Sequence, residues 1–226
     1  MARQKDLQLS RNIELQLQRF SQLVFDQSLN KLQMREQGFG AFSAKVLAKI
    51  IRESDSLTSL DLSLNNLDKG MEKLVGGIID NQSLVSVTLK NNSIDGRRFQ
   101  QEIFDMVYEH RSLASLNLGN TQSVKNRNRI HNDGLSAIMQ AIATSKTPSL
   151  IQELYLSNSS ITAKGLGCFS LIRECQVPFD LQILDLSYND LGSETPNLIE
   201  CVIPTLISLN VSHTKMGPRG AFALAQ

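Results

Sequence analysis

Leucine and isoleucine recur with one spacing along most of this chain of 226 residues. In the clearest copy the apolar residues are Leu57, Leu60, Leu62 and Leu67, with Asn65 between the last two. Leu60 and Leu62 are two residues apart, so on an extended chain both side chains point to the same face. The pattern therefore predicts a short strand with one apolar face, followed by a turn at the asparagine.

A helix is predicted after each strand. Leu67, Leu74 and Ile78 are separated by seven and then four residues, which is a helical spacing. One strand and one helix cannot bury both apolar faces alone, but stacked copies bury them against each other. We therefore expect a parallel sheet on a concave side and helices on the convex side.

Seven copies align on their third apolar position. That position recurs at residues 34, 62, 89, 118, 156, 186 and 211, in steps of 28, 27, 29, 38, 30 and 25 residues. The long step indicates an insertion of seven residues, because the asparagine due at Thr121 appears instead at Asn128.

Four asparagines occupy the same place in their copies: Asn65, Asn92, Asn128 and Asn189. An asparagine side chain both donates and accepts hydrogen bonds, so we expect these four to be buried and to bond the backbone of the turns. Three other copies carry a different oxygen-bearing residue there, which is also expected to accept a bond: Gln37, Ser159 and Thr214.

The spacing L-x-x-L-x-L-x-x-N-x-L resembles the leucine-rich repeat, and a period near 28 resembles the ribonuclease-inhibitor-like class. The resemblance covers residues 29–226 and implies a right-handed α/β solenoid, the leucine-rich repeat horseshoe, with about seven to eight repeats. The same family includes Ran GTPase-activating protein, the sensor regions of NOD-like receptors and tropomodulin. It therefore implies an architecture, not one activity.

The two ends of the chain each allow two interpretations. Residues 1–28 are either a helical cap or a degenerate first repeat. The helix predicted after Met216 stops at Gln226 without a polar cap. We expect a repeat truncated there and a chain that is a fragment of a longer protein; the alternative is a natural end docked on a partner.

Composition limits the classes of function. The formal net charge is +1, and no apolar run approaches the ~20 residues of a membrane-spanning helix. The low count of three cysteines favours a reducing compartment, with the cytoplasm as the default and the nucleus as the alternative. The sequence shows no metal-ligand spacing, phosphate-binding loop or nucleophile motif, so we expect no catalytic residues and no cofactor.

The outward strand positions are mostly small and polar. Charges there are few and of both signs. Tyr155 and Ile183 are larger outward residues, and with Tyr188 they predict a modest contact patch. The alternative is an ordinary solvated sheet face.

The inserted loop, residues 122–129, is predicted to form the main contact surface together with Tyr155 and Tyr188. Lys125, Arg127 and Arg129 lie close together without an acidic neighbour, and we expect the loop to project at the concave rim. A partner with acids or phosphates would fit these cations. No aromatic residue is interleaved with them, which argues against single-stranded nucleic acid. The alternative is a solvated loop without a binding role.

These observations favour a non-catalytic protein-binding scaffold or assembly subunit, whose unidentified partner is a protein with an acidic surface. Membrane association is not expected. By resemblance, the alternatives are a regulator of a small GTPase, like Ran GTPase-activating protein, and a cytoskeletal binder, like tropomodulin.

Overall fold

The computed structural model describes residue 15 and residues 29–122, 124–173, 179–193 and 203–224. Within these ranges, seven strands form one parallel sheet and follow one another in sequence order. They are β1 (Lys31–Gln33), β2 (Ser59–Asp61), β3 (Ser86–Thr88), β4 (Ser115–Asn117), β5 (Glu153–Tyr155), β6 (Ile183–Asp185) and β7 (Ser208–Asn210). Their central residues pair in one register, from Leu32 with Leu60 to Leu184 with Leu209. Each repeat thus adds one strand.

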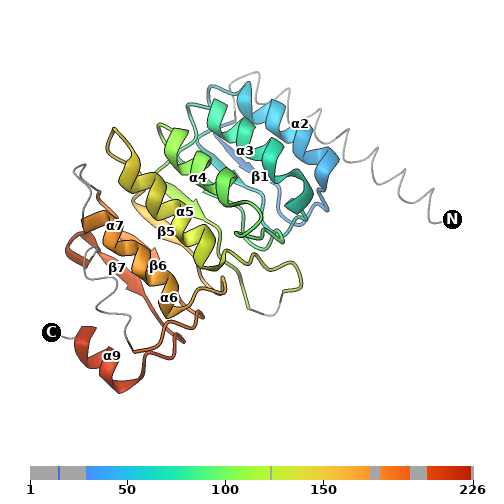
Figure 1. Cartoon of the computed structure of the whole chain (residues 1–226). Coiled ribbons are helices and arrows are strands. Elements are labelled where there is room, and N and C mark those ends of the chain that lie inside the picture. The colour runs from blue at the N-terminus through green and yellow to red at the C-terminus, as the bar shows by residue number, and fades with distance from the viewer. Residues whose placement is uncertain (1–14, 16–28, 123, 174–178, 194–202, 225–226) are drawn as a thin grey trace.

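Helical segments connect the strands. They are α2 (Ala41–Arg52), η1 (Asp68–Gly70), α3 (Met71–Asp80), α4 (Gln100–Glu109), α5 (His131–Thr144), α6 (Ala163–Leu166), η2 (Gly167–Phe169), α7 (Ser170–Arg173), η3 (Ile203–Thr205) and α9 (Gly217–Leu224). Figure 1 shows α2 to α5 side by side as one layer, with the strands as a second layer behind them. The predicted α/β solenoid is therefore confirmed.

The core lies between the sheet and the helices. Leu60 and Leu62 point into it from β2 and its end, and they are 1% and 0% exposed. Leu67, Leu74 and Ile78 meet them from the helical side and are each 0% exposed. Both predicted periodicities therefore point to the same core.

Asn65 shows how one repeat is joined to the next. Its side-chain Nδ2 donates to the carbonyl oxygens of Met34 at 2.8 Å and Leu62 at 2.9 Å. Its Oδ1 accepts the backbone N–H groups of Gln37 and Phe39 at 2.9 and 3.2 Å. One buried side chain therefore satisfies backbone groups in two adjacent turns, which would otherwise lose hydrogen bonds without water to replace them.

The other asparagines continue this ladder. Asn128 and Asn189 each form the same set of four bonds to two adjacent turns. Asn92 donates to the carbonyl of Leu62 at 2.9 Å, but its Oδ1 is buried without a partner in the described part of the chain. These three asparagines and Asn65 are each at most 4% exposed.

The prediction that other residues at this position act as acceptors is wrong. The hydroxyl of Ser159 donates to the carbonyl of Ser157 at 3.2 Å, and that of Thr214 donates to Val211 at 2.7 Å. Gln37 is exposed, and its amide donates within its own turn at 2.7 Å. Serine and threonine hydroxyls are short, so they bond locally instead of reaching the preceding repeat.

A second polar position follows the end of the helix and was not predicted. Asn81 follows α3, and its Oδ1 accepts the N–H groups of Ser83 and Leu84, both at 2.8 Å. Its Nδ2 donates to the carbonyls of Ile51 and Ser54, both at 2.7 Å, where the preceding helix ends. This amide therefore satisfies groups on both sides of a repeat junction.

His110 takes the equivalent place after α4. Its Nδ1 accepts the N–H groups of Ser112 at 3.3 Å and Leu113 at 3.1 Å. Its Nε2 is buried and has no partner among the described residues. Burial lowers the pKa of His110 to about 4, so the imidazole is neutral at pH 7.

Some predictions fall outside the described residues. The cap or first repeat expected at residues 1–28 does so except for residue 15, as do Cys175 and Cys201. Cys168 is half-buried and packs against the core.

Candidate functional site

Two asparagines close the base of the seven-residue insertion. The backbone N–H of Asn128 donates to Oδ1 of Asn120 at 2.7 Å. In return, Nδ2 of Asn120 donates to the carbonyl of Asn128 at 2.8 Å and to that of Asn158 at 2.9 Å. The inserted residues therefore leave and re-enter the repeat at one fixed point. The insertion is visible as the long yellow-green loop beside the start of α5 (Figure 1).

The preceding repeat holds one side of the loop. Asn91 donates from Nδ2 to Oγ1 of Thr121 at 3.0 Å, and its Oδ1 accepts the N–H of Thr121 at 3.2 Å. The N–H of Ser93 donates to the carbonyl of Asn126 at 3.0 Å.

The following repeat holds the other side. A guanidinium nitrogen of Arg127 donates to both the carbonyl oxygen of Asn158, at 3.1 Å, and its side-chain oxygen. Anchors on both flanks limit the conformations open to the loop backbone, and the bonds to Asn158 also hold the Arg127 side chain.

The exit of the loop packs tightly on the preceding turn. Arg129 pairs with Asp95 in a parallel bridge, and its carbonyl accepts the N–H of Gly96 at 2.8 Å. A Cβ atom at Gly96 would lie 1.9 Å from the carbonyl oxygen of Ile130. Only glycine therefore fits at this position without moving the loop.

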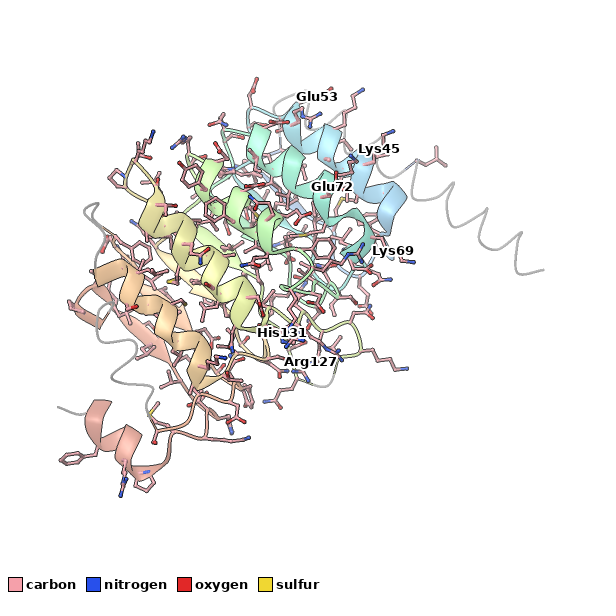
Figure 2. The ribbon with its side chains drawn as sticks, in the orientation of Figure 1. Lys45, Glu53, Lys69, Glu72, Arg127 and His131 are labelled. Carbon is pink, nitrogen blue, oxygen red and sulfur yellow. The ribbon has the colours of Figure 1, made fainter. Side chains whose placement is uncertain are left out.

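A hollow of about 590 Å³ lies beneath the loop. Its lining comes from three successive repeats and consists of Ser93, Ile94, Asp95, Lys125, Arg127, Arg129, His131 and Ser160. None of these residues belongs to a strand, so the hollow faces the turns that lead from strands to helices. Figure 2 shows Arg127 and His131 close together at the start of α5. We call this feature the basic hollow.

The charges of the basic hollow are mostly uncompensated. Lys125, Arg127 and Arg129 are exposed, and within the described ranges none of them forms an ion pair. Arg97 lies nearby but is paired with Asp133 at 3.6 Å.

His131 adds a titratable group to the basic hollow. Burial is the largest cause that lowers the pKa of His131, and the positive charges of Arg97 and Arg129 lower it further. The carboxylates of Asp95 and Asp133 act in the opposite direction but do not cancel this shift. At pH 7 the imidazole is therefore mainly neutral. The three loop cations carry the positive charge.

Another group of cations lies on the convex side, between α2 and α3, where Lys45, Lys49, Arg52 and Lys73 line a groove. Three of them are neutralised by nearby acids: Lys49 by Glu53 at 3.9 Å, Arg52 by Asp80 at 2.6 Å and Lys73 by Glu72 at 3.3 Å. In Figure 2, Lys45 lies well away from Arg127. Because most of its charge is neutralised, this groove is a weaker candidate for binding an acidic partner than the basic hollow. Its exposed cations provide control substitutions for those in the basic hollow.

The sheet face carries two residues of the predicted contact patch. Tyr155 on β5 and Ile183 on β6 are both half-buried. The Tyr155 hydroxyl donates to Oε2 of Glu153 at 3.3 Å, and the same oxygen accepts the hydroxyl of Ser115 at 2.8 Å. Burial and then the charge of Glu153 raise the pKa of Tyr155. This part of the sheet is thus polar, with an acidic group beside the aromatic ring.

Tyr188 lies apart from that pair, on the turn after β6. Its backbone is left-handed, with φ of 58°, and its side chain is exposed. The ring stacks on His213 with centroids 4.3 Å apart and an angle of 12° between the planes. Among the described residues, no hydrogen bond joins the loop cations to Tyr155, Ile183 or Tyr188.

Sequence reasoning found the three cations but missed the residues that complete the basic hollow. Ser93 and Ser160 directly follow the asparagine position in the repeats on either side of the insertion. Their repeat position was the available signal, because stacking places equivalent residues of neighbouring repeats side by side. Asp95, His131 and the anchor Asn158 also come from outside the insertion.

No group of three or more metal-ligating side chains occurs among the described residues. Of the helices that the structure describes, none is long and apolar enough to cross a bilayer.

Comparison with known sequence families identifies the repeats. One family model, described as "Leucine Rich repeat", matches residues 54–75 and 202–225, and a second leucine-rich repeat model matches residues 180–202. These matches identify leucine-rich repeats in the matched segments, and the seven-stranded sheet with its helices has the α/β solenoid fold of such repeats.

Solved structures with a similar fold are also known. The tropomodulin C-terminal domain from Caenorhabditis elegans has a TM-score of 0.50 at 16% sequence identity, over 64% of this chain and 82% of that chain. Leiomodin-1 actin-binding site 2 has a TM-score of 0.49 at 13% identity, over 62% of this chain and 76% of that chain. At such identities, the tropomodulin likeness supports the fold alone.

Proposed function

We propose that this chain is a non-catalytic protein-binding scaffold that engages an acidic partner through the basic hollow. A stack of repeats provides an extended surface, and solenoids of this kind commonly use that surface to bind other molecules. The architecture alone does not identify a site, so the proposal depends on the one place where the chain departs from its repeat.

The observation that carries the proposal is the anchoring of the inserted loop. Asn91 and Ser93 hold it from one repeat, and Asn158 holds Arg127 from the next. These bonds restrain the loop, and within the described ranges Lys125, Arg127 and Arg129 form no ion pair. Fixed charges that lack partners favour association because less conformational entropy is lost on binding.

The sheet offers a secondary contact in the proposal. Tyr155 and Ile183 lie on neighbouring strands and contribute one aromatic and one apolar side chain beside the polar pair of Glu153 and Ser115. Tyr188 is proposed as a separate contact on the next turn, since its ring is exposed and stacked on His213. Aromatic residues of this kind are enriched among the residues that dominate binding energy.

Two finer assignments belong to the same proposal. The period near 28 residues and the full helices α2 to α5 support the ribonuclease-inhibitor-like class of repeat. The low count of three cysteines supports a reducing compartment, and we assign the protein to the cytoplasm, with the nucleus as the alternative.

Affinity capture tests the proposal with three proteins: the wild type, the loop variant K125S/R129S and the convex control K45S/K73S. The loop variant keeps the anchor between Arg127 and Asn158, so it changes charge without releasing the loop. Each variant removes two cations from an exposed surface. The proposal expects a saturable protein partner that the wild type and convex control bind and that the loop variant loses. Equal binding of that partner by all three proteins contradicts it.

A cytoskeletal binder is the second candidate, kept because the repeat pattern resembles tropomodulin and the tropomodulin domain shares the fold. Co-sedimentation with actin filaments and capping of filament ends test it directly. Stimulation of GTP hydrolysis by a panel of small GTPases tests the third candidate. If the protein is active in either assay and K125S/R129S is equally active, that activity would become the proposed function and the basic hollow would have no role in it.

A further inference from the structure

The chemistry of the basic hollow indicates what its partner carries, and this inference rests on the proposed function. Lys125, Arg127 and Arg129 supply three positive charges, and Asp95 is the one carboxylate in the lining. Because His131 is mainly neutral at pH 7, the lining carries a net charge of two positive. A single carboxylate would leave half of that charge uncompensated. A phosphoryl group carries about −1.5 to −2 at pH 7 and matches it closely.

The hydrogen-bond donors also suit a phosphoryl group. Arg127 is held on Asn158 through one guanidinium nitrogen, which fixes the plane of the group and leaves its other N–H donors to point elsewhere. Ser93 and Ser160 line the same hollow, and their hydroxyls form no hydrogen bond with the described residues. Phosphoryl oxygens accept several such bonds at once, and guanidinium groups bind them with two parallel bonds.

The size of the basic hollow favours an attached group over a free ion. Its volume of about 590 Å³ lies inside the range of about 300–1,000 Å³ typical of sites for drug-sized ligands. One phosphate ion would leave most of it filled with water. A phosphorylated side chain with its flanking residues occupies more of the volume and brings backbone groups to the rim.

We propose that the basic hollow binds a phosphorylated serine or threonine in an extended segment of the protein partner. Lys125 and Arg129 attract the dianion from the exposed side, and Arg127 binds it in a fixed orientation. Ser93 and Ser160 donate from the two flanking repeats. The absence of an aromatic ring other than His131 in the lining leaves no platform for stacking bases, which disfavours nucleic acid.

Peptide titration tests the proposal. Three degenerate peptide pools share all flanking positions and carry phosphoserine, serine or glutamate at the centre, and binding is followed by fluorescence anisotropy. We expect the phosphoserine pool to bind about tenfold more tightly than either of the others, because charge-assisted bonds to a dianion are stronger. K125S/R129S is expected to abolish this preference, and K45S/K73S to retain it.

Four results would overturn the proposal. Equal affinity for the glutamate and phosphoserine pools would assign the basic hollow to carboxylates. Binding of inorganic phosphate without binding of any pool would assign it to a free ion. Binding to vesicles of phosphatidylcholine with a phosphatidylinositol phosphate, but to no peptide pool, would assign it to a membrane. A preference that survives in K125S/R129S would put the binding elsewhere on the chain.

A separate measurement distinguishes this proposal from the broader one. Lysate treated with a protein phosphatase is compared with untreated lysate in the capture experiment. A partner lost after phosphatase treatment supports the phosphoryl site. A partner captured equally from both, and lost with K125S/R129S, supports the scaffold while overturning the phosphoryl site. If no partner is captured at all, the scaffold fails, and the peptide titration still decides what the basic hollow binds.

Discussion

The side-chain amide of Asn120 bonds the backbone N–H and carbonyl of Asn128 and thereby closes the inserted loop. Asn128 donates its backbone N–H to Oδ1 of Asn120 at 2.7 Å, and Asn120 donates from Nδ2 to the Asn128 carbonyl at 2.8 Å. Both side chains are buried, at 5% and 0% exposed. This pair lets Asn128 keep its four bonds to two adjacent turns although seven residues are inserted before it.

Replacing Asn120 with Ala tests that closure. The substitution removes the Asn120 partners of the backbone N–H and the carbonyl of Asn128, so we expect a loss of about 1–3 kcal/mol in the free energy of unfolding. Urea denaturation followed by circular dichroism measures it. Gln122 is exposed on the same loop, and Gln122→Ala should change stability by less than about 0.5 kcal/mol. Equal stability of N120A and Q122A would contradict the role assigned to Asn120.

Gly96 and Gly76 form a matched pair of tests for repeat contacts. A Cβ atom at Gly96 would lie 1.9 Å from the Ile130 carbonyl oxygen, whereas one at Gly76, within α3, would have no neighbour within 4 Å. We expect Gly96→Ala to destabilise the fold by about 1–3 kcal/mol through overpacking. Gly76→Ala should stabilise it by up to about 1 kcal/mol through helix propensity. A Gly96→Ala variant as stable as the wild type, or more stable, would mean that the loop exit is not closely packed.

Leu60→Ala tests the register of the repeats. Leu60 is 1% exposed between the sheet and the helices, so its truncation should cost about 2–5 kcal/mol. Val85 is 42% exposed just before β3, and Val85→Ala should cost less than about 1 kcal/mol. A loss below about 1 kcal/mol for L60A, measured in the same urea titration, would show that the register is wrong.

His110 predicts a pH dependence of stability. Its pKa in the folded chain is about 4, below its value of about 6.5 when unfolded, so between these values the unfolded state binds more protons. The contribution of neutral His110 to the free energy of unfolding is complete above about pH 6.5 and is lost as the pH falls to about 4. At about 1.4 kcal/mol per pKa unit, the loss is up to about 3 kcal/mol.

His110→Asn is the control for this effect, because Asn81 fills the equivalent position with an amide that does not titrate. We expect the wild type to lose more stability than H110N between pH 7 and pH 4. Urea midpoints measured across that range give the comparison. Parallel pH profiles of the two proteins would show that His110 does not titrate in the folded chain.

The fold could be predicted from sequence because each repeat contains its own signals. Leu60 and Leu62 specify a strand face, and Asn128 could be located by spacing alone, since an asparagine two residues before an apolar residue has one place in the repeat. The role of Asn120 could not be predicted. It depends on the closing of an irregular loop, for which the repeat provides no template.

The candidate site was predictable only in part. Lys125, Arg127 and Arg129 lie within five residues of each other, so the sequence alone indicates their combined positive charge. The basic hollow also needs Ser93, Ser160 and other residues of the flanking repeats. Tyr188 was grouped with Tyr155 because both are aromatic and near strand ends. The left-handed backbone at Tyr188 instead turns its ring onto His213, which spacing along a strand does not anticipate.

The most direct measurement is the salt dependence of the association rate of a captured partner, by surface plasmon resonance, for the wild type, K125S/R129S and K45S/K73S. Charges at the edge of an interface act mainly on association, and salt screens them. The proposed role of the basic hollow predicts slower association and a flatter salt dependence for K125S/R129S alone, with all three melting temperatures nearly equal. Identical rates and salt slopes in the three proteins would contradict it and would move the binding surface away from the inserted loop.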